Sequence, residues 1–144
     1  MAYQLTQLPD EAAYRQLYIQ TYCNPATPIT TFDGIEVKFY SDRFDHAFFE
    51  SANRQLADKG RFSNVRAERI LWIRDTLQDP TADLRVGWDK NSKTYNKSFR
   101  VAVVKHNYVV IIWVKNGAYA KFITAYVADN SIGKILGSPA WTGL

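Results

Sequence analysis

The second half of the chain has the pattern of four consecutive β-strands. Segments 84–88, 97–105, 108–115 and 119–128 are rich in β-branched and aromatic residues and are separated by short polar stretches. Asn116-Gly117, between the last two segments, is the strongest two-residue signal for a β-hairpin, because a type I′ turn needs positive φ at both positions. Strands joined in this way form an antiparallel sheet, and the pattern does not fit a doubly wound nucleotide-binding fold.

Helical patterns come before these strands. Residues 10–22 place apolar side chains at helical spacing, and Asp10 is suited to cap the first turn. Residues 35–40 alternate between apolar and polar side chains, which predicts a strand. A second helix is expected after Asp42, with a buried stripe formed by Phe44, Phe48, Ala52 and Leu56.

A third helix is expected to open at Ser63 or Asn64 and to bury Ile70, Ile73 and Leu77. It must end by Asp79, because the proline at position 80 disfavours the helical region for the residue before it. The predicted fold class is therefore α+β, with N-terminal helices packed on one face of an antiparallel sheet of four or more strands. At 144 residues and 47% hydrophobic composition, residues 1–144 are expected to form a single domain.

The turn positions also predict which side chains share a face of the sheet. Pairing across Asn116-Gly117 sets Val110 opposite Ile123, on the aliphatic face assigned to the helices. A turn at His106-Asn107 sets Arg100 opposite Trp113, on the other face. That second face is expected to carry a basic group, hydroxyl groups and aromatic rings, from Arg100, Trp113, Phe122, Thr124 and Tyr126. Such a surface suits a single-stranded nucleic acid.

Composition and motifs exclude several classes of protein. The net charge of +4 permits a nucleic-acid partner without requiring one. Cys23 is the single cysteine, so an internal disulfide is excluded, and a reducing cytoplasmic location is expected. The sequence shows neither a membrane-spanning run nor a secretory signal, and we expect no membrane partner. Metal-ligand spacings, a P-loop and a dinucleotide fingerprint are also missing, so neither a metal nor another cofactor is predicted.

The remaining polar residues suit phosphodiester chemistry, which needs a group that moves a proton and cations that hold the phosphate. His46 lies off the apolar stripe of its predicted helix, and an imidazole titrates near neutrality. Arg66 and Arg69 are three residues apart and are expected to share a side of the third helix. Each of these side chains also has a plainer interpretation, as part of a solvated helix face.

Four segments together resemble a known family. They are Arg43-Phe-Asp-His46-Ala-Phe48, the helix Arg66-Ala-Glu-Arg69-Ile-Leu-Trp-Ile-Arg74 followed by Leu77-x-Asp79-Pro80, and the last two strands, Tyr108-Val-Val-Ile-Ile and Lys121-Phe-Ile-Thr124-Ala-Tyr126. In this combination the chain resembles the phage barnase–EndoU–colicin–RelE-like nuclease domains over residues 35–130. The resemblance implies helices packed on an antiparallel sheet and, for many members, metal-independent cleavage of RNA.

On this resemblance, we expect a small ribonuclease that forms a 2′,3′-cyclic phosphate, in the setting of a phage- or mobile-element-associated toxin. Its catalytic residues are expected to be His46, Arg66, Arg69, Thr124 and Tyr126, to which the sheet pattern adds Arg100. Trp113, Phe122 and Lys97 are assigned to substrate binding. The expected partners are RNA, such as tRNA, and an immunity or antitoxin protein. The alternative is an inactive RNA-binding or protein-interaction module of the same fold.

Overall fold

The structure is a computed structural model that describes residues 3–50, 61–89, 94–115, 119–128 and 132–137. Its elements in chain order are α1 (Glu11–Tyr18), the π-helix η1 (Ile19–Cys23), β1 (Val37–Lys38), α2 (Arg43–Phe48), β2 (Phe49–Glu50), β3 (Arg61–Phe62), α3 (Asn64–Ala67), α4 (Trp72–Leu77), β4 (Asp83–Asp89), β5 (Thr94–Lys105), β6 (Tyr108–Lys115), β7 (Tyr119–Val127) and α5 (Ile132–Leu136). The α+β class is confirmed.

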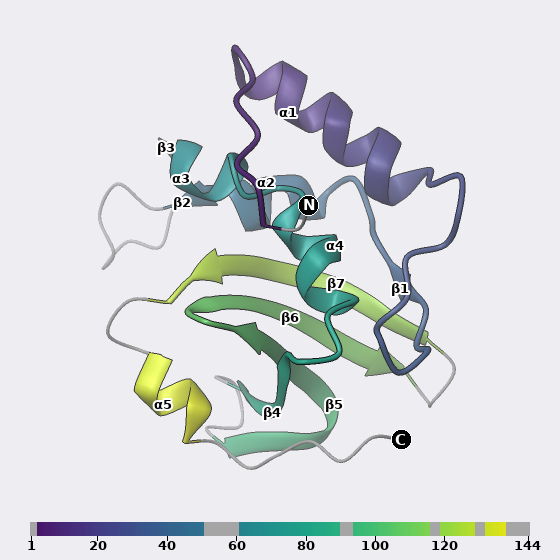
Figure 1. Cartoon of the computed structure of the whole chain (residues 1–144), viewed down its shortest axis with the longest axis vertical. Coiled ribbons are helices and arrows are strands. Elements are labelled where there is room, and N and C mark those ends of the chain that lie inside the picture. The colour runs from purple at the N-terminus through teal and green to yellow at the C-terminus, as the bar shows by residue number, and fades with distance from the viewer. Residues whose placement is uncertain (1–2, 51–60, 90–93, 116–118, 129–131, 138–144) are drawn as a thin grey trace.

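The main sheet has five strands in the order β1-β7-β6-β5-β4 (Figure 1). The four strands predicted in the second half of the chain form an antiparallel array, as expected. β1 adds a short parallel partner to β7, so the sheet is mixed. Strands β2 and β3 form a separate antiparallel pair. α1 to α4 lie on one side of the main sheet, and α5 lies on the other (Figure 1).

The predicted register between β5 and β6 is confirmed. Arg100 lies opposite Trp113, and the turn that joins the two strands contains His106. The backbone of His106 has a φ of 56°, in the left-handed region that tight turns use. His106 is therefore a turn residue.

The predicted register between β6 and β7 is wrong. Ile111 lies opposite Thr124, whereas its neighbour Ile112 lies opposite Phe122. Ile123 is therefore an extra residue in β7, a β-bulge, and the pairing on the hairpin side of it differs by one residue from the prediction. A one-residue shift exchanges the two faces of a strand. Phe122 consequently points to the helix-covered face, and Ile123 points to the other. The predicted Asn116-Gly117 turn lies outside the described residues.

The helix-covered face carries an aromatic core centred on Tyr18, which is fully buried. Its ring lies 5.7–6.4 Å, centroid to centroid, from those of Tyr22, Phe39, Phe44, Phe48 and Phe122. The Tyr18 hydroxyl donates a hydrogen bond to the Tyr40 carbonyl at 2.9 Å. This core joins α1, η1, α2 and the segment around β1 to the sheet, so it sets where α2 lies on β7.

The opposite face of the sheet carries a second, smaller core. Its buried members are Ala102, Val104, Val109, Ile111, Ile123 and Ala128. Ile135 of α5 packs against them, and so does Tyr126. Thr124 and Tyr126, which were expected to be open to a ligand on this face, are therefore half-buried.

The helices start where predicted, but their lengths differ, and the predicted cap at Asp42 is wrong, because its side chain makes no capping hydrogen bond to α2. The Asp10 side chain accepts from the backbone N–H of Ala13, which caps α1. The chain continues as the π-helix to Cys23, which is half-buried, and burial raises the pKa of its thiol. α2 ends at Phe48, because Phe49 is extended and pairs with β3. Ala52 and Leu56 of the predicted stripe lie outside the described residues.

The predicted third helix is divided into α3 and α4 by a turn. Ser63 caps α3, since its hydroxyl accepts from the backbone N–H of Arg66 at 3.2 Å. Ile70, Ile73 and Leu77 are fully buried, as expected, and α4 ends before Asp79. Arg69 lies in the turn between the two helices, so Arg66 and Arg69 do not share one continuous helix face.

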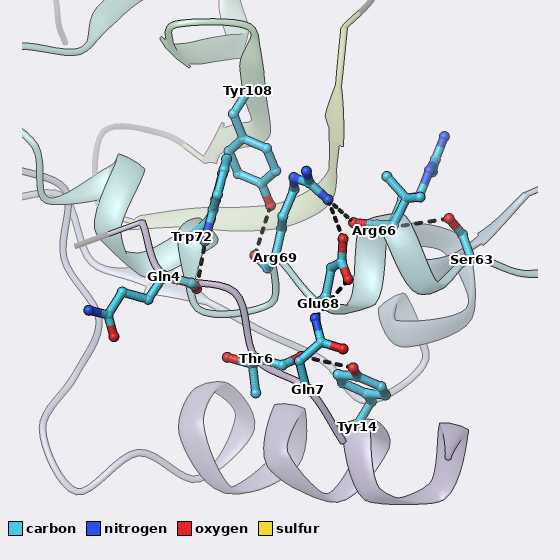
Figure 2. Close-up of polar contacts among 11 residues, drawn as sticks. Gln4, Thr6, Gln7, Tyr14, Ser63, Arg66, Glu68, Arg69, Trp72 and Tyr108 are labelled. Atoms are coloured by element: carbon cyan, nitrogen blue, oxygen red, sulfur yellow. Dashed lines mark hydrogen bonds and ion pairs between the residues drawn. The ribbon is translucent and has the colours of Figure 1, made fainter. Parts of the chain in front are cut away.

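The N-terminal segment crosses α3 and α4 as a strap, defined here as residues 3–8 (Figure 2). The backbone N–H of Thr6 donates to the carbonyl of Glu68 at 2.7 Å, and the Trp72 indole donates to the carbonyl of Gln4 at 3.0 Å. At the far end, the Tyr3 hydroxyl donates to the Asp79 carboxylate at 2.8 Å. The strap therefore supports the helical turn that carries Arg69. None of the described helices is long and apolar enough to cross a membrane.

Candidate functional site

α2 is fixed on β7 through Arg43. Its Nε and Nη2 atoms donate to the carbonyl oxygen of Ile123, at 3.1 and 2.9 Å. Ile123 is the bulge residue, so the irregular point of β7 supplies the acceptor. β1 pairs with β7 at Ala120 and Lys121, and α2 lies against β7 as well. Arg43 belongs to the motif that resembles the family, but no role was predicted for it. Its spacing of three residues from His46 indicates that the two side chains share a side of α2.

Arg66 joins the end of α2 to β7. Its Nη1 donates to the carbonyl oxygen of Ala47 at 3.2 Å. This carbonyl belongs to the last turn of α2, where a helix leaves its carbonyls without an internal partner. Its guanidinium carbon lies 5.9 Å from the ring centroid of Tyr126. His46 is exposed and is the residue before Ala47. We define the α2–β7 site as Arg66, its contact Tyr126 and His46, which precedes the Ala47 carbonyl that Arg66 binds.

Arg69 is not part of this site. Its Nη1 donates to the Val65 carbonyl at 2.7 Å and to the Glu68 carboxylate at 3.0 Å. Its guanidinium also lies over the Trp72 ring, at 5.0 Å. Figure 2 shows the Arg69 side chain directed to Glu68 and the Arg66 side chain pointing away from that pair. The expected pairing of Arg66 with Arg69 as phosphate ligands is therefore corrected.

Buried tyrosines hold in place the turn between α3 and α4, which carries Arg69. The Tyr22 hydroxyl donates to the Ile70 carbonyl at 2.6 Å and accepts from the backbone N–H of Arg74 at 3.1 Å. The Tyr108 hydroxyl donates to the Arg69 carbonyl at 3.4 Å. Burial raises the pKa of the Tyr108 phenol far above its ordinary range, so this group stays neutral. Sequence patterns had assigned neither tyrosine a role.

Thr124 and Phe122 do not present their side chains as predicted. The Thr124 Oγ1 is buried without a hydrogen-bond partner among the described residues, so it does not face a ligand at the surface. Phe122 is fully buried in the aromatic core, 4.8 Å from the Phe39 ring, and is not available to stack on a base. The correction for Phe122 follows from the bulge at Ile123, whereas Thr124 lies on the predicted face, opposite Ile111 of the second core.

The remaining predicted residues lie elsewhere on the sheet. Trp113 is 38% exposed on the face away from the helices, as predicted. Lys97 and Arg100 lie on β5, and their side chains are outside the described part of the structure. Within the described ranges, no three His, Cys, Asp or Glu side chains come together as candidate metal ligands.

Comparison of the chain with known protein families, curated proteins and solved structures finds no match. The resemblance to phage-associated nuclease domains therefore stays a prediction from the sequence. The class that the structure itself defines is an α+β protein with a mixed five-stranded sheet.

Proposed function

We propose that this protein is an endoribonuclease that cleaves RNA at the α2–β7 site. The observation that carries the proposal is the position of Arg66, which contacts both the end of α2 beside the exposed His46 and the ring of Tyr126. The imidazole of His46, the guanidinium of Arg66 and the phenol of Tyr126 would supply a proton carrier, a phosphate ligand and a hydrogen-bond donor.

In the proposed reaction, the 2′-oxygen of the RNA attacks the adjacent phosphorus. A bond forms between the 2′-oxygen and phosphorus, and the bond from phosphorus to the 5′-oxygen breaks. The products are a 2′,3′-cyclic phosphate and a 5′-hydroxyl. His46 carries out one of the two proton transfers, either accepting the proton of the attacking hydroxyl or delivering the proton that the leaving oxygen gains, and water carries out the other. Arg66 neutralises the charge that develops on the phosphate, and Tyr126 donates to one of its oxygens.

The layout of the fold supports this proposal. The early helix with His46, the helical segment with Arg66 and the last strand with Tyr126 are among the segments that resemble the phage barnase–EndoU–colicin–RelE-like nuclease domains. In this fold they meet at β7. A phage- or mobile-element toxin in the cytoplasm, controlled by an immunity protein, is the biological setting that we propose with it.

The test is incubation of the purified protein with total RNA and tRNA in excess EDTA. We expect fragments ending in 2′,3′-cyclic phosphate, and His46→Ala is expected to lower the cleavage rate by about 10²–10⁴-fold. His106→Asn is the matched control, because it removes the other histidine and keeps a residue type that tolerates positive φ. Equal cleavage by His46→Ala excludes His46 from the mechanism. Intact RNA at several pH values refutes the nuclease and favours the binding module.

A further inference from the structure

A row of basic and aromatic side chains crosses the sheet at the hairpin end of β7. Lys38 lies opposite Lys121, and Lys121 lies opposite Trp113. Their chain neighbours Val37, Ala120, Phe122, Ile112 and Val114 all belong to the core beneath the helices. Side chains alternate along a strand, so the three residues of the row point to the opposite face. Adjacent strands are about 4.8 Å apart, and the row therefore spans roughly 10 Å.

Three lysine side chains lie over aromatic rings here. The distances from Nζ to ring centroid are 3.9 Å for Lys115 over Trp113, 4.7 Å for Lys38 over Tyr119 and 5.1 Å for Lys121 over Tyr40. We call these six residues the lysine–aromatic surface. Tyr40 and Trp113 are 43% and 38% exposed, so their rings can be reached from solvent.

These lysines differ from other cations of the protein in their partners. Arg15, Arg69 and Lys105 are each paired with a carboxylate. Among the described residues, no carboxylate forms an ion pair with any lysine of the lysine–aromatic surface. An ammonium held over a ring keeps its positive charge available to an anion, whereas an ion-paired one is already neutralised.

Interleaved ammonium groups and exposed rings match the chemistry of a single-stranded polynucleotide. Its phosphates pair with cations, and its bases stack on aromatic faces whatever their sequence. An acidic protein surface would use the lysines and leave the rings without a function. A duplex would offer phosphates but keep its bases paired and stacked.

We propose that the lysine–aromatic surface binds single-stranded nucleic acid, with a base on Trp113 and phosphates on Lys38 and Lys121. Lys115 covers the Trp113 ring in the free protein, and its long side chain moves aside to a phosphate when a base stacks. Lys121 and Tyr126 are five residues apart on β7, about 16 Å along the strand, so the surface is separate from the α2–β7 site. Binding here does not depend on whether the strand is then cleaved.

The test measures fluorescence anisotropy of labelled decamers over a series of salt concentrations. The probes are 2′-O-methylated oligo(U), which lacks the attacking hydroxyl, and oligo(dT). We expect both to bind more tightly than a duplex of equal length. Trp113→Ala should weaken binding by roughly 5- to 150-fold without changing the salt dependence. The double variant Lys38→Gln/Lys121→Gln should reduce the slope of log affinity against log salt by about 1.4, because each single-strand phosphate contact contributes about 0.7.

Arg61→Gln is the matched control, since it removes one positive charge from the exposed β3 and leaves the lysine–aromatic surface intact. It should leave the affinity and the salt slope at their wild-type values. Equal binding of duplex and single strand, or equal competition by polyglutamate, would overturn the proposal, because either result means that charge alone is recognised. Wild-type binding by both Trp113→Ala and the double lysine variant would also overturn the proposal. The non-cleavable probes keep these outcomes distinct from a failure of the nuclease assay.

Discussion

The two ends of β7 hold their cations in different ways. At the bulge end, Arg43 and Arg66 donate to the backbone carbonyls of Ile123 and Ala47, so each guanidinium is fixed between elements. At the hairpin end, lysines such as Lys121 lie over aromatic rings at the surface. Arginine, with a planar fork of five donors, can bind a carbonyl and still reach a phosphate, whereas lysine is a flexible point charge.

This difference indicates two kinds of task on one strand. Catalysis requires groups held in a fixed geometry, which the bulge end provides through hydrogen bonds to the main chain. Binding a flexible strand requires charge and stacking area without a single geometry, which the hairpin end provides. Substitutions at each end test whether the two are separate in function.

The largest effect is expected at Phe122, whose ring packs in the aromatic core beneath β7. Phe122 lies between the two ends of β7, on its buried face, and packs against Tyr18 and Phe39. Phe122→Ala should lower the free energy of unfolding by about 3–5 kcal/mol, because it leaves a cavity in the aromatic core. Urea denaturation measures this loss. A stable Phe122→Ala protein with weakened RNA binding would instead restore Phe122 as a stacking residue.

The position of Phe122 also shows what sequence patterns could and could not predict. The four strands, the register of Arg100 with Trp113 and the buried positions Ile70, Ile73 and Leu77 follow from alternation and helical spacing. The bulge at Ile123 does not, because an extra residue is accommodated through tertiary contacts such as the one from Arg43. The predicted faces of the β7 residues on the hairpin side of the bulge, such as Phe122, depended on its absence.

The candidate site was also predicted only in part, because some of the contacts that form it leave no local pattern in the sequence. Arg66 contacts Tyr126 and the carbonyl of Ala47, the residue after His46, because the elements that carry them were correctly identified, and the catalytic role of all three stays a prediction. Arg69 was misplaced because a continuous helix was expected where a turn separates α3 from α4. That turn is held by Tyr22 and by the strap, contacts that span many residues of sequence and leave no local signal.

The next prediction separates the two arginines. Arg66→Ala should reduce the single-turnover cleavage rate by about 10²–10³-fold, because a preorganised phosphate ligand is removed. Arg69→Ala is the matched comparison, three residues further along, and should keep a near wild-type rate, since its guanidinium is occupied by Glu68 and Val65. Lys121→Ala should weaken substrate binding and leave the single-turnover rate at saturation unchanged. Equal losses for both arginine variants would show that the site extends to the turn.

A smaller effect concerns the strap, which supports the turn between α3 and α4. Two hydrogen bonds from Thr81, together with the Tyr3 hydroxyl and the Lys105 ammonium, lower the pKa of Asp79 from 3.8 to about 2. A lowered pKa in the folded state stabilises the fold at pH values above the unfolded-state pKa. This contribution is complete above about pH 4 and is lost as the pH falls through 2.

Asp79→Asn should therefore lower the urea midpoint at pH 7, and the difference from wild type should shrink as the pH falls from 4 towards 2. A difference that does not change with pH would mean that ionisation of Asp79 does not stabilise the strap.

The smallest effect is expected from a single charge beside the lysine–aromatic surface. Glu36 is exposed two residues before Lys38, and its place in the fold depends on its backbone carbonyl, which accepts from the N–H of Ala120 at 2.8 Å. Glu36→Gln keeps that hydrogen bond and removes a negative charge that repels phosphates. We expect oligo(dT) to bind about twofold more tightly, as is typical of one exposed charge, with the gain disappearing at high salt. Glu11→Gln on α1 changes the net charge equally. If it strengthens binding as much, then total charge rather than the lysine–aromatic surface attracts the strand, and the division of β7 into two functional ends would fail.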